Sequence, residues 1–534
     1  MKIVRALSLC VAAVLIILIL SGCSGIKPVG KEHVGAALKY SGKDIYPIKC
    51  DDTLDFWMPL NILFSSKYTN FGDTEVAKKI EEKSGVKITY IHPPQGMENE
   101  KFNLMLASDE LPDIVRADWY SYGGEKAISE NFIYRLNDIM DNWAPNLKTL
   151  LSQRSELDKM LKTDEGSYYV VPMVKDEPSQ CVYTGPIVRY DWLCDLSLPL
   201  PETIDDWENM LRRFKIEKGA AYPLGVNFDV FKQGFLIGAW GITYGFYVGN
   251  DGTVKYGPKE PGFKDFLIKM NSWYKEGLID NNFAGLDWKI QKSNILSGNS
   301  GATFGLASGD LGVWLSTAGG KNGFDLVGTK YPVLNKGETP GFSQRDHEYV
   351  SMAGFAISKK CVNPELAMRF LDFGFSEEGK NIYNYGIENK SFIIGENGKP
   401  AFTGFILNNP DGISVQNILT EYSPASYSAP TVQEKAAQVA ERTFPAQNEA
   451  VSRWEDTDEI KHQLPLIAFT NDENSKLSVF KNSIEAYCDE MTIAFIMGTK
   501  PLSEFDEFLY QLDNMKIDDV LNIYNDALKR YNNR

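Results

Sequence analysis

The segments TLDFWMPL (residues 53–60) and GDTEVAKKIEEKSGVKITY (residues 72–90) predict a strand, a helix and a second strand, and they decide the fold class. Asp73 is a suitable N-cap, apolar residues spaced four apart share one helix face, and Gly85 ends the helix. A β-α-β unit has a right-handed crossover, so its two strands lie parallel in one sheet.

The same alternation of helices and strands continues along the chain. Residues 204–215 and 263–278 predict amphipathic helices, whereas residues 301–307 and 349–358 predict strands. Roughly the last fifty residues have a strongly helical pattern, and no internal repeat is present. Because 534 residues suffice for more than one domain, we expect an α/β protein with two lobes rather than one very large sheet.

The first residues of the chain have the features of an export signal. Lys2 and Arg5 precede the apolar run 6–20, whose 15 residues are short for a bilayer-spanning helix but suit a signal peptide. The run ends in LSGC (residues 20–23), which resembles the lipobox of bacterial lipoproteins. An uncleaved signal anchor that happens to end in cysteine is the alternative.

The resemblance to a lipobox implies that residues 1–22 are a signal peptide and that Cys23 is lipidated. Two acyl chains on this cysteine would give the stable membrane anchoring that one chain does not. Residues 23–50 are polar and contain several glycines and lysines, so we expect a flexible stalk. The domain beyond them is expected at the extracellular face of the cell membrane.

Charge and cysteine content argue against several classes of protein. The net charge of −16 becomes −18 once Lys2 and Arg5 leave with the signal, which disfavours nucleic acid as a partner. Five cysteines then remain besides Cys23, an odd number without CxxC spacing, so we expect neither a disulfide framework nor a zinc site. These cysteines are Cys50, Cys181, Cys194, Cys361 and Cys488.

Motifs typical of enzymes are incomplete or missing in this sequence. GIKPVGKE (residues 25–32) and GFSEEGKN (residues 374–381) have the spacing of a phosphate-binding loop but lack the Ser or Thr that binds magnesium. The four histidines are scattered without metal-ligand spacing, and no GxSxG motif occurs. The sequence leaves open whether the chain has a pair of carboxylates for glycoside hydrolysis, because such pairs meet in space rather than in sequence.

Aromatic residues, which form 12% of the chain, recur where predicted strands have just ended. Trp119 and Tyr120 follow the strand 112–117, and Trp314 follows the strand 301–307. Ligands of α/β sheets bind beyond the carboxyl ends of the strands, and aromatic faces there suit sugar rings. The alternative for each single tryptophan is a place in the core.

Several blocks of sequence together resemble the extracellular solute-binding proteins, family 1, of ABC importers. These blocks are the opening segments quoted above, LPDIVRADW (residues 111–119), YYVVPM (168–173), RYDWLCDLSLPLPETIDDWENMLRRFK (189–215) and the C-terminal residues 495–531. The resemblance is to the large lipoprotein subset associated with oligosaccharide uptake, and it covers most of the chain after residue 50.

The resemblance implies a two-lobed fold of the periplasmic-binding-protein type II, with hinge strands between the lobes and extra C-terminal helices. We expect residues 51–179 and 333–378 to form the first lobe, and residues 180–332 and 379–534 to form the second. Such a protein is a monomeric receptor, not an enzyme, and needs no cofactor. Its ligand binds in the cleft as the lobes close, and a permease pair with a separate ATPase performs the transport.

By the same resemblance, the ligand-binding residues would come from both lobes. The first lobe would contribute the loop after its first strand and the end of a later strand, and the second lobe an aromatic-rich segment. The expected residues are Asn61, Ser65, Ser66, Tyr68, Asp118, Trp119, Asp229, Phe231, Trp240, Trp314, Arg345 and Tyr385.

The chain departs from the family pattern at one point. Many members carry a calcium loop after the helix that corresponds to residues 204–215, but here residues 214–226 contain a single carboxylate, Glu217. Calcium needs six to eight oxygen ligands, so we expect no calcium at this place.

Two other functions compete with capture of an oligosaccharide. The same scaffold accepts varied cargo, so a peptide or another polar solute is an alternative ligand. An exported carbohydrate-active enzyme that shares the anchor is the alternative from a different class. The sequence leaves open whether a sugar ligand would be neutral or anionic.

Overall fold

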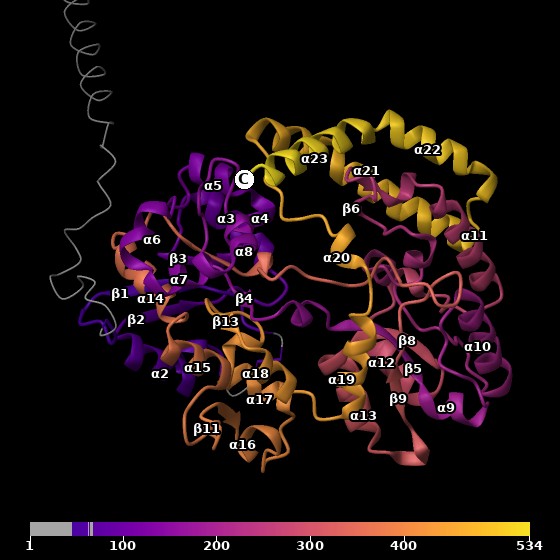
Figure 1. Cartoon of the computed structure of the whole chain (residues 1–534), viewed down its shortest axis with the longest axis horizontal. Coiled ribbons are helices and arrows are strands. Elements are labelled where there is room, and N and C mark those ends of the chain that lie inside the picture. The colour runs from indigo at the N-terminus through magenta and orange to yellow at the C-terminus, as the bar shows by residue number, and fades with distance from the viewer. Residues whose placement is uncertain (1–44, 62, 65–67) are drawn as a thin grey trace, which may run out of the picture.

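The computed structural model describes residues 45–61, 63–64 and 68–534, and these residues form two lobes side by side (Figure 1). Each lobe has its own hydrophobic core: one includes Leu54, Phe56 and Phe370, and the other includes Trp207, Phe231 and Phe495. Cys23, Ser65 and Ser66 lie outside the described residues. Within the described part of the chain, no helix is long and apolar enough to cross a membrane.

A four-stranded sheet forms the centre of the first lobe. The strands β1 (Thr53–Trp57), β2 (Lys87–Ile91), β3 (Ile114–Ala117) and β10 (Gly354–Ile357) lie in the order β10-β3-β1-β2. The pairs β1–β2 and β1–β3 are parallel, while β10 joins the edge antiparallel. This arrangement confirms the β-α-β unit expected from residues 53–90.

Helix α2 (Glu75–Ser84) connects β1 to β2, and its ends follow ordinary capping chemistry. The N-cap is Thr74, whose hydroxyl accepts the N–H of Ala77, so the expected cap Asp73 is off by one residue. Gly85 ends the helix with φ of 76°, a left-handed conformation in which a Cβ would also clash with the backbone of Ile48.

Helices α6 (Asn137–Trp143), α7 (Pro145–Gln153) and α14 (Pro364–Phe373) cover one face of this sheet. Every residue of α14 is buried, including Asp372. Burial raises the pKa of Asp372 to about 6, and donors from Leu147 and Asn146 oppose that shift. The carboxyl therefore fastens the start of α7 to the end of α14.

The second lobe contains a three-stranded antiparallel sheet in the order β8-β5-β9, formed by β5 (Thr184–Arg189), β8 (Ala302–Leu306) and β9 (Leu326–Gly328). Helix α19 (Pro445–Trp454) packs on β5 and β9. The ring of Trp454 lies so close to Gly185 that any side chain there would collide with it.

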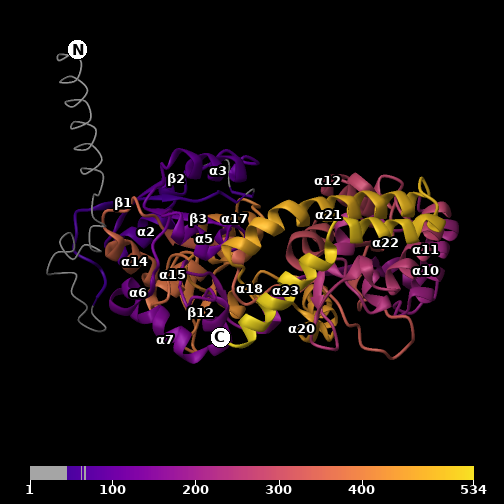
Figure 2. The same ribbon diagram turned by 90° about the horizontal axis from the view of Figure 1, so that it is seen from above.

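Three C-terminal helices extend the second lobe, as expected: α21 (Asn471–Met497), α22 (Phe505–Asn514) and α23 (Ile517–Asn532). They lie along one edge of that lobe in both views, and the chain ends beside the first lobe (Figures 1 and 2). Helix α21 packs on α11 (Gly262–Lys275), where Asn271 donates to the carbonyls of Phe495 and Ile496.

Residues 377–440 belong with the first lobe, which corrects the expected boundary at residue 379. Helices α15 (Glu377–Tyr385) and α17 (Val415–Tyr422) pack on α2. Lys390 forms an ion pair with Glu75 of α2 at 2.5 Å. The boundary is misplaced because a small separate core, built around Phe402, Ile406 and Leu419, attaches this segment to α2 rather than to the second sheet.

The chain crosses between the lobes several times, and two crossings lie against each other. Strand β4 (Val174–Lys175) begins one crossing and pairs with β13 (Val432–Gln433) of the first lobe. Asp346, on another crossing, accepts from Lys175 Nζ at 3.0 Å and from the Tyr183 hydroxyl at 2.7 Å. These crossings form the connection about which the lobes can bend.

Candidate functional site

A cavity of about 390 Å³ lies between the two lobes, and both of them contribute to its walls. Its lining consists of residues 120–126, Met160, Lys162, Thr163 and Tyr169 of the first lobe, residues 464 and 466–469 of a crossing segment, and Asn474, Leu477, Ser478, Lys481, Asn482 and Tyr524 of the C-terminal helices. We call this cavity the interlobe pocket.

The first wall follows directly from the carboxyl end of β3. Asp118 caps the short helix α4 (Trp119–Tyr122) by accepting the N–H and the hydroxyl of Ser121. The chain then turns at Gly123, where φ is 101°, into α5 (Gly124–Ser129). At Gly124 a Cβ would come within 2.7 Å of the ring of Tyr169, so only glycine allows this close approach.

The second wall is the N-terminal half of α21. Thr470 and Glu473 form a capping box that starts this helix beside the first lobe. Asn474, Ser478 and Lys481 recur at helical spacing, so they share the face of α21 that lines the pocket. This wall therefore offers an amide, a hydroxyl and an ammonium group to a bound molecule.

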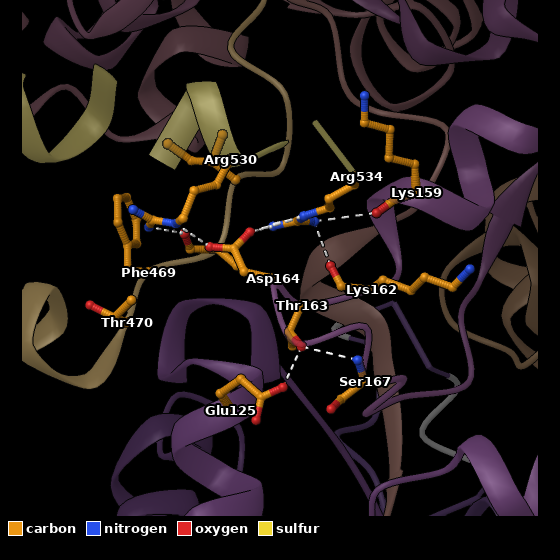
Figure 3. A network of polar contacts seen from close by, with 12 residues as sticks. Glu125, Lys159, Lys162, Thr163, Asp164, Ser167, Phe469, Thr470, Arg530 and Arg534 are labelled. Atoms are coloured by element: carbon orange, nitrogen blue, oxygen red, sulfur yellow. Dashed lines mark hydrogen bonds and ion pairs between the residues drawn. The ribbon is translucent and has the colours of Figure 1, made fainter. Parts of the chain in front are cut away.

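An ionic clamp at the C-terminus joins the two walls (Figure 3). Arg530 and Arg534 of the C-terminal segment both bind the carboxylate of Asp164, each at 2.5 Å, although Asp164 belongs to the first lobe. Arg530 also binds Glu473 at 2.6 Å, and Arg534 donates to the carbonyl of Lys162 at 2.5 Å. The side chains of Asp164, Glu473 and Arg534 are only 16%, 15% and 9% exposed.

The clamp fixes a loop that lines the pocket. Residues 162 and 163 immediately precede Asp164, and the Thr163 hydroxyl bonds to Glu125 of the opposite turn (Figure 3). Two positive and two negative side chains balance each other in the clamp. Ion pairs with low exposure and several hydrogen bonds hold their geometry better than isolated surface pairs.

The interlobe pocket presents phenols and ammonium groups to a bound molecule. Burial raises the pKa of both Tyr120 and Tyr169, so their phenols stay protonated at neutral pH. The Lys126 ammonium lies 4.3 Å from the centre of the Tyr122 ring. Among residues 45–61, 63–64 and 68–534, no group of three His, Cys, Asp or Glu side chains is placed to hold a metal ion.

Four of the expected ligand-binding residues lie in the hydrophobic cores in this conformation, and their contact with a ligand stays a prediction. The Trp119 indole is fully buried, donates to the Val115 carbonyl at 3.0 Å and packs against Phe102. Phe231, Trp314 and Tyr385 are likewise buried. Tyr385 is the last residue of α15, and its ring packs against Phe392 and Phe402.

The other expected residues are more accessible but do not converge. On the first lobe, Asp118 and Tyr68 are half-buried, and the Asn61 side chain accepts the N–H of Leu63. On the second lobe, Trp240 lines a different hollow beside His462. The remaining two are Asp229, which is paired with Lys232 at 3.3 Å, and Arg345, which donates to the Pro178 carbonyl of a crossing segment.

None of the ten described residues in the expected set lines the interlobe pocket, although Asp118 and Trp119 directly precede it. The sequence marks Tyr120 as a candidate for the ligand site, because it is an aromatic residue that follows a strand. The pocket residues of α21 carry no such signal, because an amphipathic helix does not reveal in sequence which neighbour its polar face meets. Residues 214–226, where we expect no calcium loop, contain one carboxylate, Glu217, which is paired with Arg213 at 2.5 Å.

Known proteins share both the sequence and the fold of this chain. The fructooligosaccharide ABC transporter substrate-binding protein FusA of Streptococcus pneumoniae serotype 4 is 25% identical over 292 residues, 51% of this chain and 53% of the relative. That match therefore spans about half of the length of FusA. Lipoprotein LipO of Bacillus subtilis is 26% identical over 373 residues, 65% of this chain and 69% of the relative.

The whole described fold has a counterpart among solved structures. The crystal structure of the alginate-binding protein AlgQ2 without calcium ion superposes with a TM-score of 0.74 and 26% identity, and it covers 89% of this chain and 98% of AlgQ2. The model of the family described as bacterial extracellular solute-binding protein matches residues 70–381, more than half of the chain. The chain therefore belongs to the bacterial extracellular solute-binding proteins, which are receptors and not enzymes.

Proposed function

We propose that this protein is the lipid-anchored receptor of an ABC importer, that it captures an oligosaccharide in the interlobe pocket, and that it delivers this ligand to a permease pair driven by a separate ATPase. The observation that carries the proposal is the placement of the pocket. Its walls come from both lobes, so a bound molecule contacts both at once. A ligand that binds the closed state better shifts the population of the protein toward closure.

The chemistry of the walls supports a sugar ligand. Tyr120 and Tyr122 offer ring faces and phenols, while Asn474 and Ser478 offer groups that bind hydroxyls. We further propose that Asp118 contacts the ligand from the edge of the pocket. Asn61, Ser65, Ser66, Tyr68, Asp229, Trp240 and Arg345 stay proposed contacts for a closed conformation.

The relatives support the same class of ligand and the same location. FusA is the substrate-binding protein of a fructooligosaccharide transporter, AlgQ2 binds alginate, and LipO is a lipoprotein. Together with the lipobox at residues 20–23, these relatives support a monomer anchored through Cys23 on the outer face of the cell membrane.

A thermal-shift screen of the purified domain against neutral and acidic oligosaccharides, and against short peptides, tests the proposal. Ligand at one hundred times Kd stabilises the native state by about 2.7 kcal/mol. We expect at least one oligosaccharide to raise the melting temperature. A shift with peptides and with none of the sugars would refute the proposed ligand class.

A pair of variants on α21 tests the location of the site. Ser478→Trp places an indole in the interlobe pocket, and we expect it to weaken oligosaccharide binding at least tenfold. Ser475→Trp is the matched control, because Ser475 is exposed on the same helix but does not line the pocket. Equal affinity of both variants and the wild type would place the ligand elsewhere.

A further inference from the structure

Arg116 is a half-buried arginine in the central sheet of the first lobe, and its Nε is the buried part of the side chain. It is the third residue of β3, opposite Phe355 of β10 in the sheet. Its Nε is buried and has no hydrogen-bond partner, and among the described residues no carboxylate forms an ion pair with its guanidinium. Burying a guanidinium without a partner is costly, so such groups usually pair with an anion.

The nearest carboxylate does not fulfil this role. Asp118 affects Arg116 electrostatically, yet its two oxygens accept the N–H and the hydroxyl of Ser121. No ion pair joins Asp118 to Arg116, although they are two residues apart in the chain. Arg189, in contrast, pairs with Asp191 at 2.5 Å.

A second unpaired group lies next to Arg116. The hydroxyl of Tyr427 is buried and has no hydrogen-bond partner, and the charge of Arg116 acts on it. Tyr427 follows the short helix Pro424–Ser426 and comes from a different part of the chain. Two buried donors without partners, from separate segments, therefore influence each other electrostatically, and each calls for a hydrogen-bond acceptor.

This place lies at the edge of the first lobe that faces the connection to the second. Residues after Tyr427 enter β13, which pairs with β4 at the start of a crossing segment. Asp118 is an electrostatic neighbour of Arg116 and also of Tyr120 and Tyr169, which line the interlobe pocket. Arg116 lies outside the lining of the interlobe pocket, which begins at Tyr120, so a ligand of several sugar units would have to extend past Asp118 to reach it.

We propose that Arg116, assisted by the Tyr427 hydroxyl, binds the carboxylate of an acidic sugar residue, so that the oligosaccharide captured by this receptor contains uronic acid. A planar guanidinium matches a carboxylate with two parallel hydrogen bonds, and a phenol adds a third. This inference rests on the proposed function, and it adds the charge class of the ligand and the residues that recognise it.

Calorimetry with matched ligand pairs tests the charge class. Each pair consists of an oligosaccharide of galacturonate, glucuronate or mannuronate and its neutral methyl ester of the same length. We expect an acidic member to bind at least tenfold more tightly than its ester. If neutral sugars bind and every acidic one fails, the inference is wrong while the proposed function stands; if no sugar of either kind binds, the proposed function itself fails.

Variants test the residues. For the acidic oligosaccharide we expect Arg116→Met to reduce affinity about 30-fold or more and Tyr427→Phe about fivefold. Affinity for the methyl ester should change less than threefold in both. The control Arg212→Met removes an exposed arginine that is paired with Glu276 on the second lobe, and it should leave binding unchanged.

The melting temperature without ligand separates a binding role from a structural one. Because the buried Nε of Arg116 has no hydrogen-bond partner in the ligand-free protein, we expect Arg116→Met to keep or raise this temperature. A clear fall in melting temperature together with unchanged affinity for the acidic ligand would show that Arg116 only supports the fold, and would overturn the inference.

Discussion

Glu459 illustrates how a single half-buried carboxyl couples this protein to pH. It accepts the N–H of Ser343 at 2.9 Å on a segment next to the crossings. Burial raises the pKa of Glu459 to about 8, and the positive charge of Arg345 only partly opposes this. In the unfolded chain a glutamate has a pKa of about 4.3, so folding takes up a proton between these two values.

The contribution of Glu459 to the free energy of unfolding should therefore fall as the pH rises from about 4.3 to about 8. Above about pH 8 this contribution should stay constant. Glu459→Gln keeps the acceptor for Ser343 and removes the titration. We expect this variant to be more stable than the wild type by about 1–2 kcal/mol at pH 8 and equal to it at pH 4.

Urea unfolding at several pH values measures this difference. The variant Glu156→Gln, at an exposed position, serves as the control. Its free energy of unfolding should equal that of the wild type at every pH. If the free energy of unfolding differs between Glu459→Gln and the wild type by the same amount at pH 4 and at pH 8, the raised pKa of Glu459 is contradicted.

Trp119 and Tyr120 show why the site could be predicted only in part from single residues. Both are aromatic and both follow β3, so composition and position do not distinguish them. The turn of α4 directs the Trp119 indole toward Phe102 and the core, whereas Tyr120 reaches the pocket and donates to the Ile467 carbonyl at 3.0 Å. The sequence therefore does not reveal which of the two side chains turns toward the pocket.

At the scale of elements, the C-terminal helix α23 matters because its end is tied to the opposite lobe. Asp164→Asn removes the charge that neutralises Arg530 and Arg534, and it leaves Glu473 to balance both. Breaking a mostly buried pair by removing one partner is strongly destabilising. We expect the free energy of unfolding to fall by about 2–3 kcal/mol and ligand affinity to fall with it, since the loop at Lys162 and Thr163 loses its anchor.

Chemical denaturation and calorimetry of the same variant measure both effects. Asp456→Asn is a suitable control, because its ion pair with Lys330 is about half exposed on both sides, at 50% and 55%. Such a pair contributes about 0–1 kcal/mol. If Asp164→Asn behaves like this control in stability and affinity, the clamp does not position the pocket.

At the scale of the whole molecule, the two separate cores and the crossings between them make bending the main expected motion. The proposed lipid attachment site, Cys23, precedes both lobes in the sequence, so its loss should not alter that motion. We therefore expect Cys23→Ser to release the protein from membranes into the medium while ligand affinity stays within twofold of the wild type.

Fractionation of cells followed by calorimetry on the released protein tests this separation. A strain that carries the wild-type chain is the control for retention in the membrane fraction. Retention of Cys23→Ser in that fraction would favour the uncleaved signal anchor over lipidation.

Sequence by itself determined the local structure and the class of this protein. The β-α-β unit, the amphipathic helices and the C-terminal helices follow from periodicity and capping, which depend on residues a few positions apart. Tertiary structure alone decided that residues 377–440 join the first lobe, that α21 forms one wall of the interlobe pocket, and that Asp164 meets Arg530 and Arg534. These contacts join residues hundreds of positions apart, and their partners are chosen by the packing of whole elements rather than by any local pattern.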